Sequence, residues 1–93
     1  MVVKVSVIGL GYLGATHATA MAELGHEVIG IEIDSKKLEQ LSGGSIPFHE
    51  PGLEQAFSRH LSSGHIKLSS DFASLASADL HFICVGTDRK SVV

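Results

Sequence analysis

Apolar and β-branched residues gather in four short runs along the chain, at residues 2–8, 27–33, 65–69 and 80–85. The first run is almost continuously apolar, which is typical of a strand buried on both faces of a parallel sheet. The third run alternates apolar and polar residues, which predicts a short strand at a sheet edge. The segments between the runs have helical spacing, and this alternation predicts an α/β fold with a parallel sheet.

The first predicted helix covers residues 12–24 and is rich in alanine and other small residues. Small residues suit a helix that packs closely on a sheet. Gly25 stands where a glycine commonly ends a helix. The positions Leu13, His17, Ala20 and Leu24 lie on one stripe of this helix.

Three further helices are predicted downstream. Asp34 is placed to cap the helix that follows it, and Pro51 is placed to begin the next one. A brief helix over residues 71–76 is expected to be capped by Ser70 or Asp71. The helix after Pro51 carries an apolar stripe, formed by Leu53, Ala56, Phe57 and Leu61.

The run GLGYLG, at residues 9–14, separates the first predicted strand from the first helix. Gly9 allows a tight turn, Gly11 lacks the Cβ that would keep a pyrophosphate away, and Gly14 lets the helix lie close to the sheet. The free N–H groups and the dipole at the helix start favour an anion. A glycine turn needed only for packing is the alternative. The strand before it and the helix after it favour a dinucleotide site.

An acidic residue stands near the end of the second predicted strand. Glu32 follows Gly14 at close to the spacing of about 20 residues that the motif requires, and its carboxylate is expected to bind the adenosine ribose. Because an acid would repel a 2′-phosphate, the motif favours NAD over NADP. A solvated strand-end acid is the alternative for Glu32. The pattern predicts a partial Rossmann fold, a parallel sheet of about four strands in the order 3-2-1-4 with flanking helices.

Composition limits the classes of function. The 93 residues predict one small domain, and the formal net charge of -3 lacks the basic footprint of a nucleic-acid-binding protein. No apolar run reaches the ~20 residues of a membrane span. Cys84 is the only cysteine, which suits a reducing cytoplasm, and the histidines lack metal-ligand spacing. His49 and Glu50 could form an acid–base pair, although a helix-capping acid is the favoured role of Glu50.

Four stretches together resemble the nucleotide-sugar 6-dehydrogenases, above all the UDP-glucose 6-dehydrogenases. They cover residues 5–14, 22–28, 46–53 and 82–87. The most specific elements are Glu-Pro-Gly-Leu at residues 50–53 and Val-Gly-Thr at residues 85–87. The GDP-mannose and UDP-N-acetylmannosamine dehydrogenases share these elements, so the resemblance leaves the sugar open.

The resemblance implies an enzyme family that oxidises the sugar 6-hydroxyl to a carboxylate in two NAD-dependent steps, through a thioester on a cysteine. It implies that Glu32, usually Asp in the family, holds the adenosine ribose and that Lys37 grips the same end of NAD. The other residues implied to border the cofactor are Gly9, Gly11, Tyr12, Leu13, Gly14, Val85, Gly86 and Thr87. Cys84 lacks the motif of the catalytic cysteine, so we expect it to be a core thiol in a buried strand.

The chain departs from the family pattern after Thr87, where Asp88 replaces the usual proline. The resemblance therefore implies a truncated member, residues 1–93 of an NAD-binding domain without the central and nucleotide-sugar domains or any catalytic residue. We expect the chain alone to bind NAD weakly and to leave nucleotide sugars unoxidised. The uncovered strand at residues 80–85 predicts a homo-oligomer. A stand-alone dinucleotide-binding module and a structural fragment that binds nothing are the alternatives.

Overall fold

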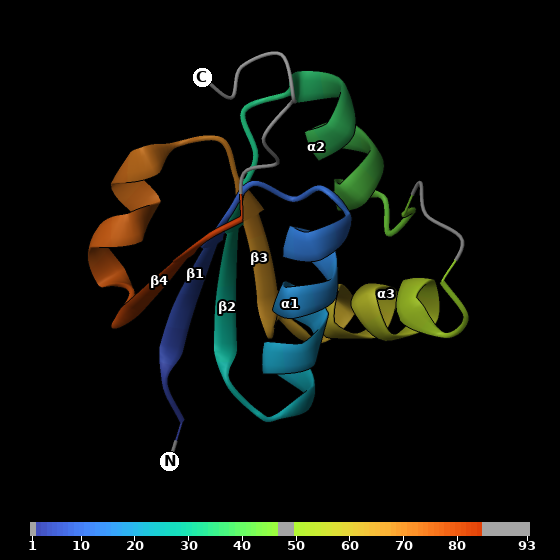
Figure 1. Ribbon diagram of the computed structural model, residues 1–93, viewed down its shortest axis with the longest axis horizontal. Coiled ribbons are helices and arrows are strands. Elements are labelled where there is room, and N and C mark those ends of the chain that lie inside the picture. The colour runs from blue at the N-terminus through green and yellow to red at the C-terminus, as the bar shows by residue number, and fades with distance from the viewer. Residues whose placement is uncertain (1, 47–49, 85–93) are drawn as a thin grey trace, which may run out of the picture.

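The computed structural model describes residues 2–46 and 50–84 of the chain. Strands and helical segments alternate along this part of the molecule (Figure 1). In chain order they are β1 (Lys4–Ile8), α1 (Tyr12–Glu23), β2 (Glu27–Ile31), α2 (Ser35–Ser42), α3 (Leu53–Ser63), β3 (Ile66–Ser69), the 3-10 helix η1 (Phe72–Ser77) and β4 (Leu80–Ile83). The α/β class predicted from the apolar runs is confirmed.

The four strands form one parallel sheet in the order β3-β2-β1-β4, as predicted. The central strand β1 pairs with β2 on one side and with β4 on the other. Ile8, the last residue of β1, lies opposite Ile31 of β2 and Ile83 of β4. The segments that follow these strands therefore start at one edge of the sheet, the carboxyl edge, where open α/β sheets bind their ligands.

One face of the sheet carries the hydrophobic core. Helices α1 and α3 contact each other, and α1 also contacts β1 and β2 (Figure 1). The apolar stripe predicted for α3 is confirmed, since Leu53 and Phe57 are buried and Ala56 and Leu61 are half-buried. The buried cluster consists of Val5, Val7, Leu10, Ala18, Ala22, Val28, Leu41, Ile46, Leu53, Phe57 and Ile66.

The predicted close packing of α1 through its small residues is confirmed, whereas most of the stripe of Leu13, His17, Ala20 and Leu24 is exposed. Leu13 and Leu24 are 66% and 68% exposed, and Ala20 is also exposed. The buried residues of α1 are instead its small ones, Gly14, Ala15, Ala18, Thr19 and Ala22. The helix lies so close to the sheet that small side chains fill the interface, and the larger leucines face outward.

Several boundaries also differ from the prediction. Strand β2 ends at Ile31, so Glu32 lies just beyond the strand. Helix α3 begins at Leu53 because Gly52 is its N-cap with φ of 81°, and this left-handed conformation cannot continue a helix. Cys84 lies one residue past β4 and is half-buried, packed against the core cluster. The expected buried strand position is therefore wrong for Cys84, and its contact with the core is confirmed.

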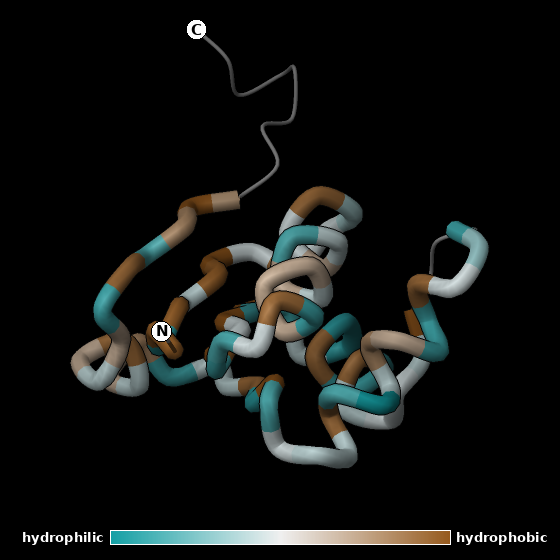
Figure 2. Tube along the Cα trace, turned by 90° about the horizontal axis from the view of Figure 1, so that it is seen from below, coloured by the Kyte–Doolittle hydropathy of each residue, from teal (hydrophilic) through white to brown (hydrophobic). Residues whose placement is uncertain are grey.

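Strand β4 is an edge of the described sheet. Its outer side chains are poorly covered, since Leu80 is 51% and Ile83 is 73% exposed. Figure 2 shows mainly hydrophobic positions along this strand, which leads to the grey C-terminal trace. Within the described residues, no helix is long and apolar enough to cross a membrane.

Candidate functional site

The glycine turn after β1 adopts a conformation that requires glycine at its first position. Gly9 has φ of 91°, in the left-handed region that residues with a Cβ rarely adopt. Its N–H donates a 2.8 Å hydrogen bond to the carbonyl oxygen of Ile31, at the end of β2. The turn therefore leaves β1 sharply and is fixed to the neighbouring strand at the carboxyl edge.

Gly14 is required by packing. A Cβ at this position would lie 1.8 Å from the carbonyl oxygen of Gly9 and 3.4 Å from the Cβ of Cys84. The first contact is far shorter than any that real atoms make, so any larger residue would push α1 away from the turn. Gly14 thus sets the close approach of helix and sheet that the sequence predicted.

Gly11 is required by neither conformation nor packing within the described protein. It is the N-cap of α1 with an extended backbone, φ of -73° and ψ of -162°, and a Cβ added to it would meet no atom within 4 Å. It carries no side chain that could accept hydrogen bonds from the first turn of the helix. The space next to Gly11 is open, beside a helix start that favours an anion. A pyrophosphate fits this arrangement.

Glu32 is buried at the same edge of the sheet, with 7% of its surface exposed. One carboxylate oxygen, Oε1, accepts a 2.9 Å hydrogen bond from the N–H of Leu10 in the glycine turn. The other, Oε2, accepts a 3.0 Å hydrogen bond from the N–H of Asp34. The alternative of a solvated strand-end acid is therefore wrong. Each oxygen retains a second acceptor position, so the carboxylate can still bind a ligand hydroxyl.

The segment after Glu32 continues this network. Asp34 caps α2 as predicted, because its Oδ1 accepts hydrogen bonds from the N–H groups of Lys36 at 3.0 Å and Lys37 at 3.2 Å. Lys37 lies in the first turn of α2 and is half-buried. The structure thereby places Lys37 on the helix that begins directly beyond Glu32.

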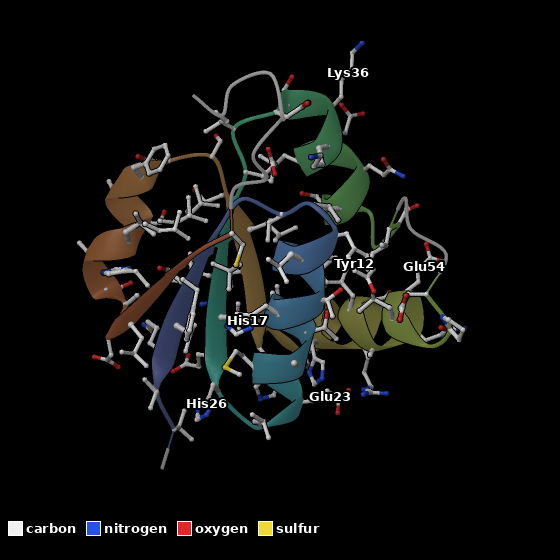
Figure 3. The ribbon with its side chains drawn as sticks, in the orientation of Figure 1. Tyr12, His17, Glu23, His26, Lys36 and Glu54 are labelled. Atoms are coloured by element: carbon white, nitrogen blue, oxygen red, sulfur yellow. The ribbon has the colours of Figure 1, made fainter. Side chains whose placement is uncertain are left out.

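Tyr12 and Leu13, the first residues of α1, are 49% and 66% exposed next to the open space at Gly11. The Tyr12 hydroxyl donates a 3.1 Å hydrogen bond to Oε2 of Glu50. Figure 3 shows Tyr12 on the side of α1 that faces α3. The hydrogen bond with Glu50, and then the negative charge of that carboxylate, raise the pKa of Tyr12 above its ordinary value. Glu50 is therefore not the predicted capping acid, and within residues 2–46 and 50–84 no side chain caps the start of α3.

Val85, Gly86 and Thr87 fall outside the described residues, as does His49. His60 lies near Glu23, with 3.1 Å between Nε2 and Oε1, at the other end of α1. Among the described residues, no group of three or more His, Cys, Asp or Glu side chains could hold a metal ion.

A cavity of about 420 Å³ lies along β2 and β3, from Lys4 and Glu27 at the amino ends of β1 and β2 to Ser69 at the carboxyl end of β3. Its lining includes Lys4, Glu27, His65, Lys67, Ser74 and Ser77. Ligands of open α/β sheets bind beyond the carboxyl ends of the strands. The glycine turn, Glu32 and the start of α2 gather at that carboxyl edge and none of them lines the cavity, so we take them, and not this cavity, as the candidate site.

Residue-based reasoning found the three glycines and Glu32 but missed the contact between Tyr12 and Glu50. These two residues are separated by 38 positions along the chain, and hydrophobic periodicity gives no information about such a polar contact. The one available signal was the Glu-Pro-Gly-Leu element, which marked Glu50 as a distinctive residue without showing what it contacts.

Comparison with known proteins gives a consistent result. The sequence model described as "UDP-glucose/GDP-mannose dehydrogenase family, NAD binding domain" matches residues 3–92. The chain is 41% identical to GDP-mannose 6-dehydrogenase of Pseudomonas syringae pv. syringae, over 94% of this chain and 20% of that protein. It is 37% identical to a UDP-glucose 6-dehydrogenase of Bacillus subtilis, over 95% of this chain and 20% of that protein.

Solved structures agree. A UDP-glucose dehydrogenase from the archaeon Pyrobaculum islandicum matches with a TM-score of 0.86 and 41% identity, over 94% of this chain and 20% of that one. A UDP-N-acetyl-mannosamine dehydrogenase from Staphylococcus aureus matches with a TM-score of 0.79 and 34% identity, over 88% and 19%. The chain thus spans about a fifth of the length of its relatives. It belongs to the UDP-glucose/GDP-mannose dehydrogenase family, and the part of the family that it represents is the NAD-binding domain.

Proposed function

We propose that the chain binds NAD at the carboxyl edge of its sheet, with the pyrophosphate on the glycine turn. The observation that carries the proposal is the open space at Gly11, the one glycine of the motif that neither backbone conformation nor packing explains. A ligand that approaches the backbone closely would account for this glycine. The residues that would border the pyrophosphate are Gly9, Gly11, Tyr12 and Leu13, with Gly14 setting the position of the helix.

Glu32 would hold the adenosine ribose in this arrangement. Its two hydrogen bonds to Leu10 and Asp34 fix the orientation of the carboxylate before any ligand arrives. A fixed acceptor loses little conformational freedom on binding. The same negative charge would repel a 2′-phosphate, so we expect NAD to bind more tightly than NADP. Lys37 would assist at the adenosine end of the cofactor.

Calorimetric titration of the purified chain with NAD, NADP and ADP-ribose tests this proposal. We expect NAD and ADP-ribose to bind with similar, weak affinity and NADP to bind more weakly. Substituting Gly11→Ala places a methyl group in the open space and should weaken NAD binding at least tenfold while the chain stays folded. Gly43→Ala is the matched control, because Gly43 also has negative φ and its added Cβ would meet no atom closer than 3.5 Å. Equal NAD affinity of the Gly11→Ala variant and the wild type would refute the proposed pyrophosphate site.

We further propose that this domain serves the NAD-dependent oxidation of a nucleotide sugar at its 6-hydroxyl, with UDP-glucose as the first candidate. Membership of the family supports the reaction. GDP-mannose is the second candidate, because the GDP-mannose 6-dehydrogenase and the UDP-glucose 6-dehydrogenase compared above have similar sequence identity to this chain. The chemistry requires a nucleophile, an acid–base group and a bound sugar held together, so we expect the 93-residue chain to form no NADH with either sugar. A reducing, cytoplasmic setting suits its single cysteine.

A further inference from the structure

The contact between Tyr12 and Glu50 joins two functional segments of the molecule. Tyr12 is the first residue of α1 and directly follows Gly11, whereas Glu50 lies three positions before the start of α3. The phenol donates a 3.1 Å hydrogen bond to the Glu50 carboxylate. The proposed cofactor site and the segment that leads into α3 are thus connected through one side-chain pair.

The Glu50 end of this contact is itself fixed. The Glu50 carbonyl oxygen accepts a 3.1 Å hydrogen bond from the N–H of Leu53, and Leu53 is buried in the core at the first turn of α3. In the same turn, Oε1 of Glu54 accepts a 3.0 Å hydrogen bond from the N–H of Ile46. Glu50 therefore stands on a segment that is held to the body of the protein and can act as an anchor.

The Tyr12 end lies at the surface. The Tyr12 side chain is 49% exposed at the surface, and an exposed ring can populate several rotamers. Any ordering of a side chain beside the pyrophosphate site that occurs only when the cofactor binds costs affinity. A hydrogen bond that selects one rotamer in advance removes part of that cost.

We infer that Glu50 is a positioning residue, which holds the Tyr12 ring beside the glycine turn and so prepares the site for NAD. The inference rests on the proposed function, because it assumes that the cofactor lies on this turn. It assigns a purpose to the Glu50 carboxylate of the Glu-Pro-Gly-Leu element, the side chain that sequence reasoning had assigned to helix capping.

The acid–base behaviour of Tyr12 gives an independent measure of the contact. Glu50 favours the neutral phenol and raises its pKa above the ordinary value of about 10. Because the pKa is raised in the folded state, the contact is present at neutral pH and up to pH 10. It is lost only as the pH rises through the higher folded value, where the phenolate would repel the carboxylate.

The chain allows this measurement directly, because it contains one tyrosine and no tryptophan. The phenolate absorbance therefore reports on Tyr12 alone. We would titrate the wild type, Glu50→Gln, Glu50→Ala and the control Glu39→Gln, whose glutamate is exposed on α2. The same four proteins would be titrated with NAD by calorimetry, and circular dichroism would show that each is folded.

We expect the Tyr12 midpoint to fall in both Glu50 variants and to stay unchanged in Glu39→Gln. NAD affinity should fall about three- to tenfold in Glu50→Ala, the range of one surface hydrogen bond. Glu50→Gln keeps an acceptor oxygen for the phenol, so it should restore affinity to within about twofold of the wild type. A positioning role thus predicts that Glu50→Gln lowers the Tyr12 midpoint but keeps NAD affinity, whereas Glu50→Ala lowers both. A loss of folding would instead lower the NAD affinity of both variants.

Three results would overturn the inference, and they differ from one another. Equal Tyr12 midpoints in the wild type and Glu50→Ala would mean that the contact is absent in solution. A shifted midpoint with unchanged NAD affinity in Glu50→Ala would mean that the contact forms but does not prepare the site. A wild type that binds no NAD would remove the proposed function, and with it this role of Glu50, whatever the Tyr12 titration showed.

Discussion

Glu32→Gln should destabilise the fold, because the native carboxylate accepts hydrogen bonds from two backbone N–H groups. The native side chain offers one oxygen to the N–H of Leu10 and the other to the N–H of Asp34. Glutamine has nearly the same shape but only one acceptor oxygen, and its NH₂ group would face the second N–H. One of the two backbone donors must therefore lose its partner.

The magnitude follows from the bonds that change. A buried donor left without an acceptor costs about 1–3 kcal/mol. The remaining bond loses its charge assistance, and since charge-assisted bonds are about twice as strong as neutral ones, this adds about 1 kcal/mol. The expected loss of unfolding free energy is about 2–4 kcal/mol. For a domain of this size that corresponds to a fall in Tm of roughly 10–30 °C, and the chain should still fold.

Thermal unfolding followed by circular dichroism measures this loss, with Glu27→Gln as the control. Glu27 is an exposed glutamate at the start of β2, the strand that ends just before Glu32. Its substitution should change the unfolding free energy by less than about 0.5 kcal/mol. Amide exchange should also be faster at Leu10 or Asp34 in Glu32→Gln. A Tm of Glu32→Gln within a few degrees of the control would refute the reasoning, because the cost of burying the charge would then cancel both bonds.

Three other substitutions give separate tests. Gly14→Ala should cost about 3 kcal/mol or more in urea unfolding, because its Cβ would overlap the Gly9 carbonyl oxygen; a loss below 1 kcal/mol would show that α1 can shift freely. Asp34→Ala removes the cap of α2 and should cost about 0.5–2 kcal/mol by the same assay, and an unchanged midpoint would contradict the capping role. We propose that the wild type self-associates through β4, so Ile83→Lys should shift it to monomer in analytical ultracentrifugation; a wild-type monomer at high concentration would contradict this edge pairing.

The sheet could be predicted from sequence because three of its strands lie in mostly apolar runs, the fourth lies in an alternating run, and clear breaks separate them. The runs at 2–8 and 27–33 contain β1 and β2 in full, and their order follows from the fold that the glycine motif predicts. The predicted runs were longer than the strands by one to two residues at some ends. Apolar residues continue past the last ladder hydrogen bond, so composition alone overestimates strand length.

The small residues of α1 predicted that it packs closely on the sheet, but the stripe of Leu13, His17, Ala20 and Leu24 did not identify its buried face. Leu13 and Leu24 are the largest apolar residues of that segment, yet both face outward. The residues of α1 that are buried are small ones, Gly14, Ala15, Ala18, Thr19 and Ala22, so the helix leaves little room for a large side chain on that face. Sequence periodicity gives the angle between residues on a helix but not the distance between the helix and its neighbour.

The candidate site was predicted in part for a similar reason. Local spacing identified Gly9, Gly11 and Glu32, because turn and strand end are adjacent in any fold of this type. It could not show that Glu32 also binds the glycine turn, since that bond depends on the burial of the carboxylate. The partner of Tyr12 depends on where α3 packs against α1, and that is decided by tertiary structure alone.

The contrast between Gly14 and Gly11 also bears on how such domains diverge. A change at Gly14 destabilises the fold, because any Cβ there would overlap the Gly9 carbonyl oxygen, so selection for a stable fold opposes it. A change at Gly11 is free of that penalty, because the position has room for a side chain and no special backbone angle. A descendant released from cofactor binding could therefore accumulate replacements at Gly11 while Gly14 stayed fixed. In a set of related chains, variation at Gly11 together with constancy at Gly14 would mark the chains that kept the fold but no longer bind the ligand.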